Sequence, residues 1–446
     1  MSQFILIEDL YKHYLNAQQI ICTDTRKLIS GSVFFALKGE NFNANEFAQK
    51  AFEAGCSIAV VDEPKYVTNS KIVLVEDTLK TLQQLANYHR KQLHIPVLAI
   101  TGSNAKTTNK ELINAVLSKK YKTLATFGNL NNHIGVPLTL LSITQQHEFA
   151  IIEMGANHLG EIDELCRIAE PDYGLITNIG KAHLEGFGGI EGVKIGKSEL
   201  YRFLKEKHGQ VFINGDDEIL HDLALDNDKI TYGCKKLYDV IGKDISKSET
   251  VTTDHAGVSL KFTTRYGDKD WNKIPAINTQ IAGSYNFINC LTAAAVGHYF
   301  KVEDSLIKEA LEEYVPNMNR SQLVKTVSNT ILLDAYNANP SSMKAAIENF
   351  ANYSAAKKLL LLGDMFELGE YSAEEHSKII ELLKEKKLNN VILVGEEFFK
   401  QNDNDFIKFK TTEESRDYLK NQPINNTAIL IKGSRGMKME TLQDVL

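Results

Sequence analysis

Short apolar runs alternate with amphipathic segments along most of the chain. Runs such as 97–100, 149–153 and 358–362 have the composition of strands that are buried on both faces. The segment from about 77 to 92 instead carries leucine and alanine at helical spacing. Continuous apolar strands that alternate with helices predict parallel sheets covered by helices on both sides, which is the α/β class.

Two prolines and a change of pattern divide the chain into three parts. Pro96 opens the first fully apolar strand, and Pro316 follows the last helix of the middle part. We expect an N-terminal α/β substrate-binding domain over 1–93, a central parallel-sheet ATPase domain with a phosphate loop over 94–314, and a C-terminal Rossmann-like α/β domain over 315–446.

The predicted elements differ between the central and C-terminal parts. Polar, threonine-rich alternation over 237–281 predicts an antiparallel appendage to the central sheet, followed by helices at 285–300 and 303–314. In the C-terminal part we expect strands at 330–334, 358–362, 390–394 and 427–432 and helices at 341–352 and 373–387.

Composition and charge narrow the functional classes. The 446 residues carry a net charge of −7, which argues against a nucleic-acid-binding protein. No apolar stretch approaches the roughly 18 residues of a membrane-spanning helix, and the N-terminus lacks the pattern of a signal peptide. The five cysteines are too sparse for a disulfide framework and are expected to be reduced. We therefore expect a soluble, cytoplasmic protein without membrane insertion, acting as a monomer.

The strand at 97–100 runs directly into a segment with the features of a phosphate-binding loop. Its residues are Thr101, Gly102, Ser103, Asn104, Ala105, Lys106, Thr107 and Thr108. A helix that begins near Lys106 would direct backbone N–H groups and its dipole at a phosphate, and Lys106 would add a cation. Thr107 would offer its hydroxyl to Mg²⁺. The alternative is an ordinary helix N-terminus with a solvent-exposed lysine.

Ala105 departs from the strict phosphate-loop pattern. Ile100 and Ala105 stand where that pattern has glycines. Glycine in such loops often has φ > 0, a region that costs alanine about 1 kcal/mol or more. We expect Ala105 to keep a negative φ and the loop to remain active. The alternative is a nucleotide-binding protein that has lost catalysis.

Two residues that follow other buried strands belong near this loop. Glu153 ends the run 149–153, and His183 follows the run 174–179. Because ligands bind at the carboxyl ends of parallel strands, both side chains are candidates for an Mg²⁺ site. A lone histidine, however, is more often structural, and Mg²⁺ prefers oxygen ligands.

Taken together, these segments resemble the Mur ligase family over essentially the whole chain. The segments that carry the resemblance are 23–26, 101–108, 128–137, 153–155, 182–185, 283–289, 319–321, 334–340, 363–369 and 432–436. The loop and histidine motifs are shared by all Mur ligases and by folylpolyglutamate synthases. The segments 334–340 (DAYNANP) and 363–369 (GDMFELG) point to the members that add D-Ala-D-Ala to UDP-N-acetylmuramoyl-tripeptide in peptidoglycan precursor synthesis.

The resemblance implies a reaction and a set of catalytic residues. ATP phosphorylates the carboxylate of the first substrate, and the amine of the second substrate attacks the acyl phosphate. Lys106 would neutralise the transferred phosphoryl group, Thr107 and Glu153 would hold one Mg²⁺, and His183 would serve a second. Lys197 matches a lysine that the family carries as a carbamate, with Lys194 as the competing position. From the residues alone, both lysines read as part of an exposed helix face.

The resemblance also assigns nucleotide and substrate contacts. Besides the loop from Gly102 to Thr108, the expected ATP contacts are Asn286, Asn289, Arg320 and Asp334. For the UDP-linked substrate, the expected contacts are Thr25 and Arg26 at the UDP end and Asn131 and Asn132 at the muramoyl and pyrophosphate part. For D-Ala-D-Ala, the expected contacts are Asn337, Asn339 and Arg435. Tyr285 replaces a histidine that is common in the family motif. The two asparagines before Pro340 also fit a purely turn-forming role.

Three functions remain open at this point. The first is the D-Ala-D-Ala-adding ligase. The second is another amide ligase of the same superfamily, either a different Mur step or a folylpolyglutamate synthase-like enzyme. The third is the non-catalytic nucleotide-binding homologue that Ala105 suggests.

Overall fold

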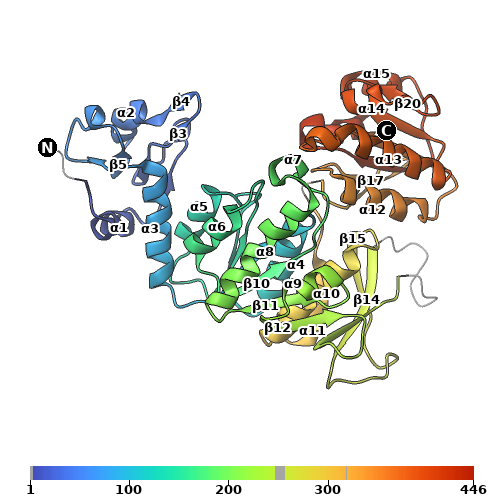
Figure 1. Ribbon diagram of the computed structural model, residues 1–446, viewed down its shortest axis with the longest axis horizontal. Coiled ribbons are helices and arrows are strands. Elements are labelled where there is room, and N and C mark those ends of the chain that lie inside the picture. The colour runs from blue at the N-terminus through green and yellow to red at the C-terminus, as the bar shows by residue number, and fades with distance from the viewer. Residues whose placement is uncertain (1–3, 247–256, 318) are drawn as a thin grey trace.

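The computed structural model describes residues 4–246, 257–317 and 319–446. These residues form sheets of four, nine and six strands, in that order along the chain, and one two-stranded hairpin. In Figure 1 the first sheet lies at the left, the second in the centre and the third at the upper right. The predicted α/β class is confirmed.

The N-terminal sheet is parallel throughout and has the strand order β1-β2-β5-β6. Its elements are α1 (Ile7–Asn16), β1 (Ile21–Cys22), β2 (Val33–Phe35), the hairpin strands β3 (Lys38–Gly39) and β4 (Phe42–Asn43), α2 (Ala48–Glu53), β5 (Ile58–Val61), β6 (Ile72–Leu74) and α3 (Thr78–Gln92). Helix α3 is confirmed where the spacing predicts it. Its N-cap Asp77 accepts a hydrogen bond from the backbone N–H of Lys80, and its buried face packs against α1 on one side and α5 and α6 of the central part on the other.

The central sheet has the strand order β15-β14-β13-β12-β11-β10-β7-β9-β8. Its strands are β7 (Val97–Thr101), β8 (Thr123–Ala125), β9 (Phe149–Glu153), β10 (Tyr173–Ile176), β11 (Gln210–Asn214), β12 (Asp228–Gly233), β13 (Val240–Asp244), β14 (Gly257–Thr264) and β15 (Ile277–Ala282). Strands β13, β14 and β15 pair antiparallel as predicted. They are joined to the main sheet, because β13 also pairs in parallel with β12. Part of that predicted segment, 247–256, lies outside the described residues.

Helices cover both faces of the central sheet. They are α4 (Lys106–Leu117), α5 (Gly135–Leu141), α6 (Glu161–Ala169), α7 (Leu184–Phe187), α8 (Ile190–Glu206), α9 (Glu218–Leu223), α10 (Asn286–Tyr299) and α11 (Asp304–Glu313). Along β7, Val97 and Ala99 belong to one hydrophobic core, whereas Leu98 and Ile100 belong to another that includes α4 and α10. Alternate side chains of a strand point to opposite faces, which explains why a strand between two cores is apolar at every position.

The C-terminal sheet has the strand order β16-β17-β21-β18-β19-β20, and only β16 is antiparallel. Its elements are β16 (Gln322–Lys325), β17 (Thr330–Asp334), α12 (Pro340–Ala351), β18 (Lys358–Gly363), α13 (Ser372–Glu385), β19 (Val391–Val394), α14 (Glu396–Lys400), β20 (Ile407–Phe409), α15 (Thr412–Lys420) and β21 (Ala428–Lys432). The four predicted strands and two predicted helices are confirmed. The edge strands β16 and β20 were not foreseen, because they are short and only partly buried.

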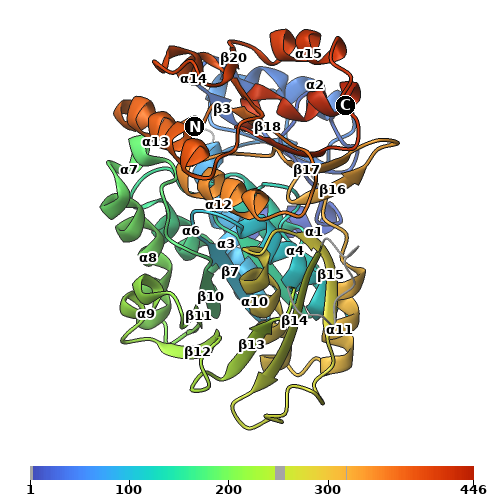
Figure 2. The ribbon, with the colours of Figure 1, turned by 90° about the vertical axis from the view of Figure 1, so that its right-hand side faces the viewer.

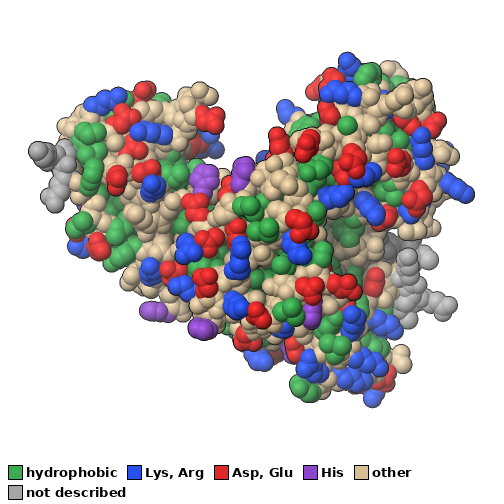
Figure 3. All heavy atoms as spheres, in the orientation of Figure 1, with side chains coloured by type: hydrophobic (Ala, Val, Ile, Leu, Met, Phe, Trp, Pro, Cys, Tyr) green, Lys and Arg blue, Asp and Glu red, His purple; other side chains and the backbone are tan. Residues whose placement is uncertain are grey.

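The three sheets surround a hollow. Figure 2 shows α12 and α13 directly above the central part. The surface in Figure 3 is hollowed between the N-terminal and C-terminal parts, above the central one. Within the described ranges, no helix is both long and apolar enough to cross a membrane.

Candidate active site

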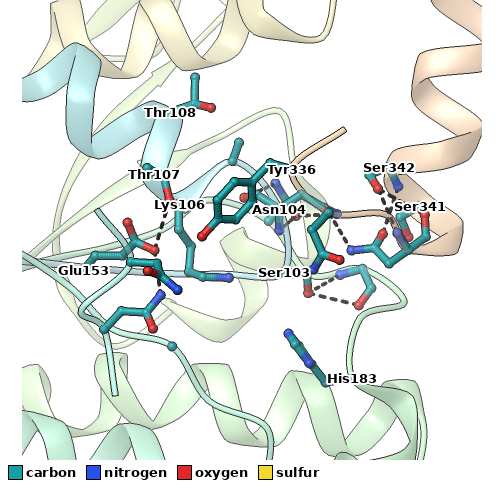
Figure 4. Close-up of a pocket in the computed structure, with 18 of the residues that line it drawn as sticks. Ser103, Asn104, Lys106, Thr107, Thr108, Glu153, His183, Tyr336, Ser341 and Ser342 are labelled. Atoms are coloured by element: carbon teal, nitrogen blue, oxygen red, sulfur yellow. Dashed lines mark hydrogen bonds between the residues drawn. The ribbon is translucent and has the colours of Figure 1, made fainter. Parts of the chain in front are cut away.

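A cavity of about 740 Å³ lies where the carboxyl ends of β7, β9 and β10 meet those of β17 and β21. It is lined by residues of the central part, among them Lys106, Glu153 and His183, and by residues of the C-terminal part. Figure 4 shows these side chains around one space. Both contributing sheets are parallel at this edge, which is where open α/β sheets bind ligands.

The phosphate loop enters α4 through a left-handed residue. Ala105 is the N-cap of α4 and has φ +60° and ψ +16°, so the expectation of a negative φ is wrong. The sharp turn from strand to helix requires this conformation, and neighbouring side chains hold it. Thr177 Oγ1 donates to the Asn104 carbonyl oxygen at 2.6 Å, and Asn109 Nδ2 donates to the Ala105 carbonyl oxygen at 2.9 Å. An L-residue in this region costs roughly 1–2 kcal/mol.

Gly102, at the start of the loop, has no room for a side chain. A Cβ added to Gly102, whose φ is +140°, would lie 2.0 Å from Thr177 Oγ1. Lys106 Nζ donates to the Gly102 carbonyl oxygen at 2.7 Å, and burial lowers the pKa of Lys106. The N-cap residue Ala105 makes no side-chain capping hydrogen bond, so the N–H groups of the first turn of α4 remain available to an anion. The loop residues from Ser103 to Thr108 line the cavity, whereas Gly102 does not.

Glu153 provides a buried carboxylate beside the loop. Its Oε1 accepts hydrogen bonds from Thr107 Oγ1 at 3.2 Å and from Asn131 Nδ2 at 2.7 Å. Its Oε2 is buried without a hydrogen-bond partner in the described part of the chain. A buried carboxylate oxygen rarely stays unsatisfied, and carboxylate and hydroxyl oxygens suit Mg²⁺. The described residues contain no cluster of three or more His, Cys, Asp or Glu side chains that could hold a metal, so an ion here would need further oxygens from a ligand or water.

His183 lies across the cavity from the loop (Figure 4). It has φ +53° at the N-terminus of α7, and its Nδ1 forms an ion-pair contact with the carboxylate of Glu367. The contact with His183 lowers the pKa of Glu367. Glu367 was not predicted as a site residue. Its only signal was its place within the family segment 363–369.

Lys197 is completely buried within α8, so the alternative of an exposed helix face does not hold for it. Its Nζ donates to the Ala156 carbonyl oxygen at 3.0 Å and lies 5.0 Å from the centre of the Phe187 ring. Burial lowers the pKa of Lys197 well below its ordinary value. Lys197 is not among the residues that line the cavity, and Lys194 is only partly buried.

The two asparagines of α10 line the cavity but are already hydrogen-bonded to the protein. Asn289 Oδ1 accepts from Asn109 Nδ2 at 2.8 Å, and Asn289 Nδ2 donates to Asn286 Oδ1 at 2.8 Å. Asn286 Nδ2 in turn donates to the Ala282 carbonyl oxygen at 2.6 Å. Tyr285, which replaces the family histidine, bonds through its hydroxyl to Ser321 Oγ at 3.0 Å.

The C-terminal part contributes a buried ion pair and a stacked arginine. Lys432 Nζ lies 2.6 Å from Asp334 Oδ2, and Lys432 is only 2% exposed. The Arg320 guanidinium lies 3.5 Å from the centre of the Tyr336 ring. All four side chains line the cavity. Lys432 and Tyr336 were not predicted, although a lysine that ends a buried apolar strand was a readable signal.

The predicted substrate residues divide into two groups. The cavity lining includes Asn131, Asn132, Asn337 and Asn339, and it does not include Thr25, Arg26 or Arg435. Arg26 is exposed, and its guanidinium donates two hydrogen bonds of 2.9 Å to Asp24 in the N-terminal part. Arg435 is exposed beside the cavity, with its guanidinium 5.3 Å from the centre of the Tyr336 ring.

Asn339 fills the turn-forming role that was left open. It caps α12 by accepting a hydrogen bond from the Ser342 backbone N–H at 2.9 Å. Its Nδ2 donates to Asn104 Oδ1 in the phosphate loop at 2.7 Å. Lys181 adds two further contacts between the parts, through its backbone N–H to Ser341 Oγ at 2.9 Å and through Nζ to Glu375 at 2.6 Å. The C-terminal part therefore contacts the phosphate loop directly.

A phosphate loop and a buried carboxylate beneath a second α/β unit are the features of a nucleotide-binding enzyme. Two family models match the chain, the Mur ligase middle domain over residues 100–297 and the Mur ligase glutamate ligase domain over residues 319–435. The chain belongs to the Mur ligase family.

Individual members of the family are similar to this chain over nearly its whole length. A Bacillus subtilis protein named UDP-N-acetylmuramoyl-tripeptide–D-alanyl-D-alanine ligase is 38% identical, over 95% of this chain and 92% of its own length. A crystal structure of MurF from Acinetobacter baumannii is similar at a TM-score of 0.84 and 31% identity, over 97% of both chains. The MurF ligase from Thermotoga maritima, solved with ADP, has a TM-score of 0.83 at 25% identity, over 96% of this chain and 97% of its own.

Proposed function

We propose that this chain is an ATP-dependent ligase that joins D-Ala-D-Ala to UDP-N-acetylmuramoyl-tripeptide in peptidoglycan precursor synthesis. The observation that carries the proposal is the unpartnered Glu153 oxygen beside the uncapped N-terminus of α4, in a cavity shared by two α/β parts. The relatives of nearly full length supply the substrates, because they bear the name of this ligase.

The reaction has two steps that this cavity suits. A carboxylate oxygen of the tripeptide attacks the γ-phosphorus of ATP, the bond to the β,γ-bridging oxygen breaks, and ADP leaves. The amine of D-Ala-D-Ala then attacks the acyl carbon, loses a proton and expels inorganic phosphate. Such phosphoryl transfer depends on positioning and charge neutralisation. Lys106 and the N–H groups at the start of α4 provide both.

The donor set fits Mg²⁺ at one position. Glu153 Oε2 and Thr107 Oγ1 would hold the ion. Bound Mg²⁺ would supply charge neutralisation at the phosphate oxygens. We also propose a second Mg²⁺, served by His183.

Lys197 is proposed to carry a carbamate. Burial lowers the pKa of its amine and so favours the uncharged form, which is the form that adds to CO₂ with loss of a proton. Titration with labelled bicarbonate, followed by carbon NMR, should give a carbamate signal that is lost in Lys197→Met. A spectrum identical in both proteins would exclude the modification.

The remaining assignments extend the same proposal. The N-terminal domain (1–93) would bind the UDP end through Thr25 and Arg26, and Asn131 and Asn132 of the central domain (94–314) would meet the muramoyl part. In the C-terminal domain (315–446), Asn337 and Arg435 would bind the dipeptide, with Asn339 positioning α12.

ATP would be contacted by Asn286, Asn289, Arg320 and Asp334 around the phosphate loop. We also propose that the enzyme acts as a monomer. Because ATP and the UDP-linked substrate are made in the cytoplasm, we propose a cytoplasmic enzyme.

The test is ADP release with UDP-N-acetylmuramoyl-tripeptide, with and without D-Ala-D-Ala, beside a panel of single amino acids and a folate acceptor. We expect release that depends on D-Ala-D-Ala. Release with a single amino acid but not with the dipeptide would identify another ligase of the superfamily. Tight ADP binding without turnover on any acceptor would identify a non-catalytic homologue.

A further inference from the structure

The phosphate loop holds one residue in a strained conformation. Ala105 lies in the left-handed region, where the Cβ of an L-residue crowds its own backbone. Ala105 is also the N-cap of α4, and it has no side-chain hydrogen-bonding group with which to stabilise the helix start. A strained backbone of this kind persists only where its surroundings hold it.

Asn109, one turn further along α4, provides that restraint. Its backbone N–H and its side-chain Nδ2 both donate to the Ala105 carbonyl oxygen, each at 2.9 Å. Asn109 is 1% exposed, and its Oδ1 has no hydrogen-bond partner within the described ranges. The side chain therefore acts through the two hydrogen bonds that its amide nitrogen donates.

The second of these bonds reaches α10, the neighbouring helix, which also lines the cavity. Asn109 Nδ2 donates to Asn289 Oδ1 at 2.8 Å, and the chain of amides continues through Asn286 to the Ala282 carbonyl oxygen. Asn286 and Asn289 line the cavity from α10, whereas Asn109 does not line it. Asn109 thus lies behind the site and joins the phosphate loop to α10.

We propose that Asn109 is a positioning residue of the nucleotide site. By holding Ala105 left-handed, it keeps the amide N–H groups at the start of α4 directed at the phosphates, and its second bond fixes the loop against α10. The inference rests on the proposed nucleotide role of this cavity. It does not depend on the identity of the acceptor, so it is tested by ADP binding alone.

The first test is a double-mutant cycle of Asn109→Ala and Ala105→Gly, read out as the Kd of ADP with Mg²⁺ by calorimetry. In the native background Asn109→Ala should weaken ADP binding about ten-fold, which corresponds to about 1.4 kcal/mol. In the Ala105→Gly background the same change should weaken it by about two-fold at most, because glycine enters the left-handed region without strain. Equal losses in both backgrounds would overturn the proposal, since a merely structural asparagine gives that result.

The second test separates the two bonds. A helical threonine can donate its hydroxyl to the carbonyl oxygen four residues earlier, so Asn109→Thr keeps a bond to Ala105 and loses the one to Asn289. We expect its Kd for ADP to stay within about three-fold of the native value. A threonine variant as weak as Asn109→Ala would show that the restraint does not act on Ala105, and would overturn the proposal.

Two further variants serve as controls for these tests. Asn114→Ala removes another asparagine from α4, far from the loop, and should leave the Kd for ADP unchanged. Ala105→Gly alone should raise the thermal midpoint by about 2–4 °C, because it relieves strain. This variant remains informative if Asn109→Ala fails to fold, and a fall in its midpoint would contradict the strain on which the proposal depends.

Discussion

Two helix N-termini meet in the cavity, and they are capped differently. Helix α4 begins at Ala105 without a side-chain cap, whereas α12 begins with a capping box between Asn339 and Ser342 and with Pro340 in its first turn. The first N–H groups of a helix have no partner within the helix. Those of α12 are partly satisfied or removed by its own residues, and those of α4 are left open. Phosphate binding is therefore expected at α4 and not at α12.

Two buried lysines, one in the central part and one in the C-terminal part, also differ in their partners. In the central part, Lys197 is 0% exposed and has a carbonyl oxygen as its hydrogen-bond acceptor. In the C-terminal part, Lys432 is 2% exposed and is paired with Asp334. The unpartnered oxygen of Glu153 also belongs to the central part. At the cavity, the central part thus leaves a carboxylate oxygen without a partner, whereas the C-terminal part pairs its buried lysine with a carboxylate. The contrast is confined to these charged groups, because Arg320 Nε of the C-terminal part also lacks a partner among the described residues.

The largest expected effect on activity comes from a change at the uncapped N-terminus of α4. Lys106→Ala removes the cation at the start of α4, and ligase activity should fall about 100- to 1000-fold, as when one electrostatic group of a transition-state site is lost. The measurement is ADP release at saturating substrates. Lys122→Ala, at an exposed lysine, is the matched control and should keep full activity. Activity of Lys106→Ala within ten-fold of native would place the transferred phosphoryl group elsewhere.

Breaking the paired lysine should destabilise the C-terminal part. Lys432→Met leaves the Asp334 carboxylate without its partner, and we expect the free energy of unfolding to fall by about 3 kcal/mol. Denaturant unfolding followed by a probe in the C-terminal part measures this. Adding Asp334→Asn should recover part of the loss, because no uncompensated charge then remains. An unchanged transition in Lys432→Met would mean that the pair is not formed.

Removing Lys197, which has no carboxylate partner, should raise stability, whereas removing Lys432 should lower it. In protein kept free of bicarbonate, where Lys197 is an unmodified amine, Lys197→Met relieves the cost of burying that amine and should raise stability at neutral pH by on the order of 2 kcal/mol. With bicarbonate present, the same variant should abolish ligation. Because the folded-state pKa of Lys197 is lowered, its cost is full below that pKa and vanishes as pH approaches the unfolded value of about 10.4. The gain in thermal midpoint should therefore shrink between pH 7 and pH 10. A gain independent of pH would point to packing instead.

The smallest effect is expected at the capped helix. Asn339→Ala removes the cap of α12 and should lower stability by about 1 kcal/mol, with the Kd of ADP within about two-fold of native. Asn339→Ser retains a capping oxygen but loses the bond to Asn104, and should keep native stability. A loss of ADP affinity ten-fold or greater in Asn339→Ala would show that α12 also serves the phosphates.

Local sequence patterns were enough to predict the main strands and helices of the fold. The apolar runs of β7, β9 and β18 and the helical spacing of α3 predicted elements that the structure contains nearly residue for residue. The loop from Ser103 to Thr108 and Glu153 were also found, because both directly follow buried strands and the carboxyl ends of parallel strands share one edge of a sheet. These features depend on neighbours in the chain, and the sequence contains that information.

Packing between distant segments decided the rest. The left-handed Ala105 depends on bonds from Asn109 and Thr177, the burial of Lys197 depends on what covers α8, and the partner of His183 comes from the C-terminal loop that holds Glu367. A single sequence without structure shows neither which side chains face each other nor how much solvent remains between them. Those two quantities set the strain, the pKa and the pairing of each group, so only the folded chain determines which of its polar residues are left free for a ligand.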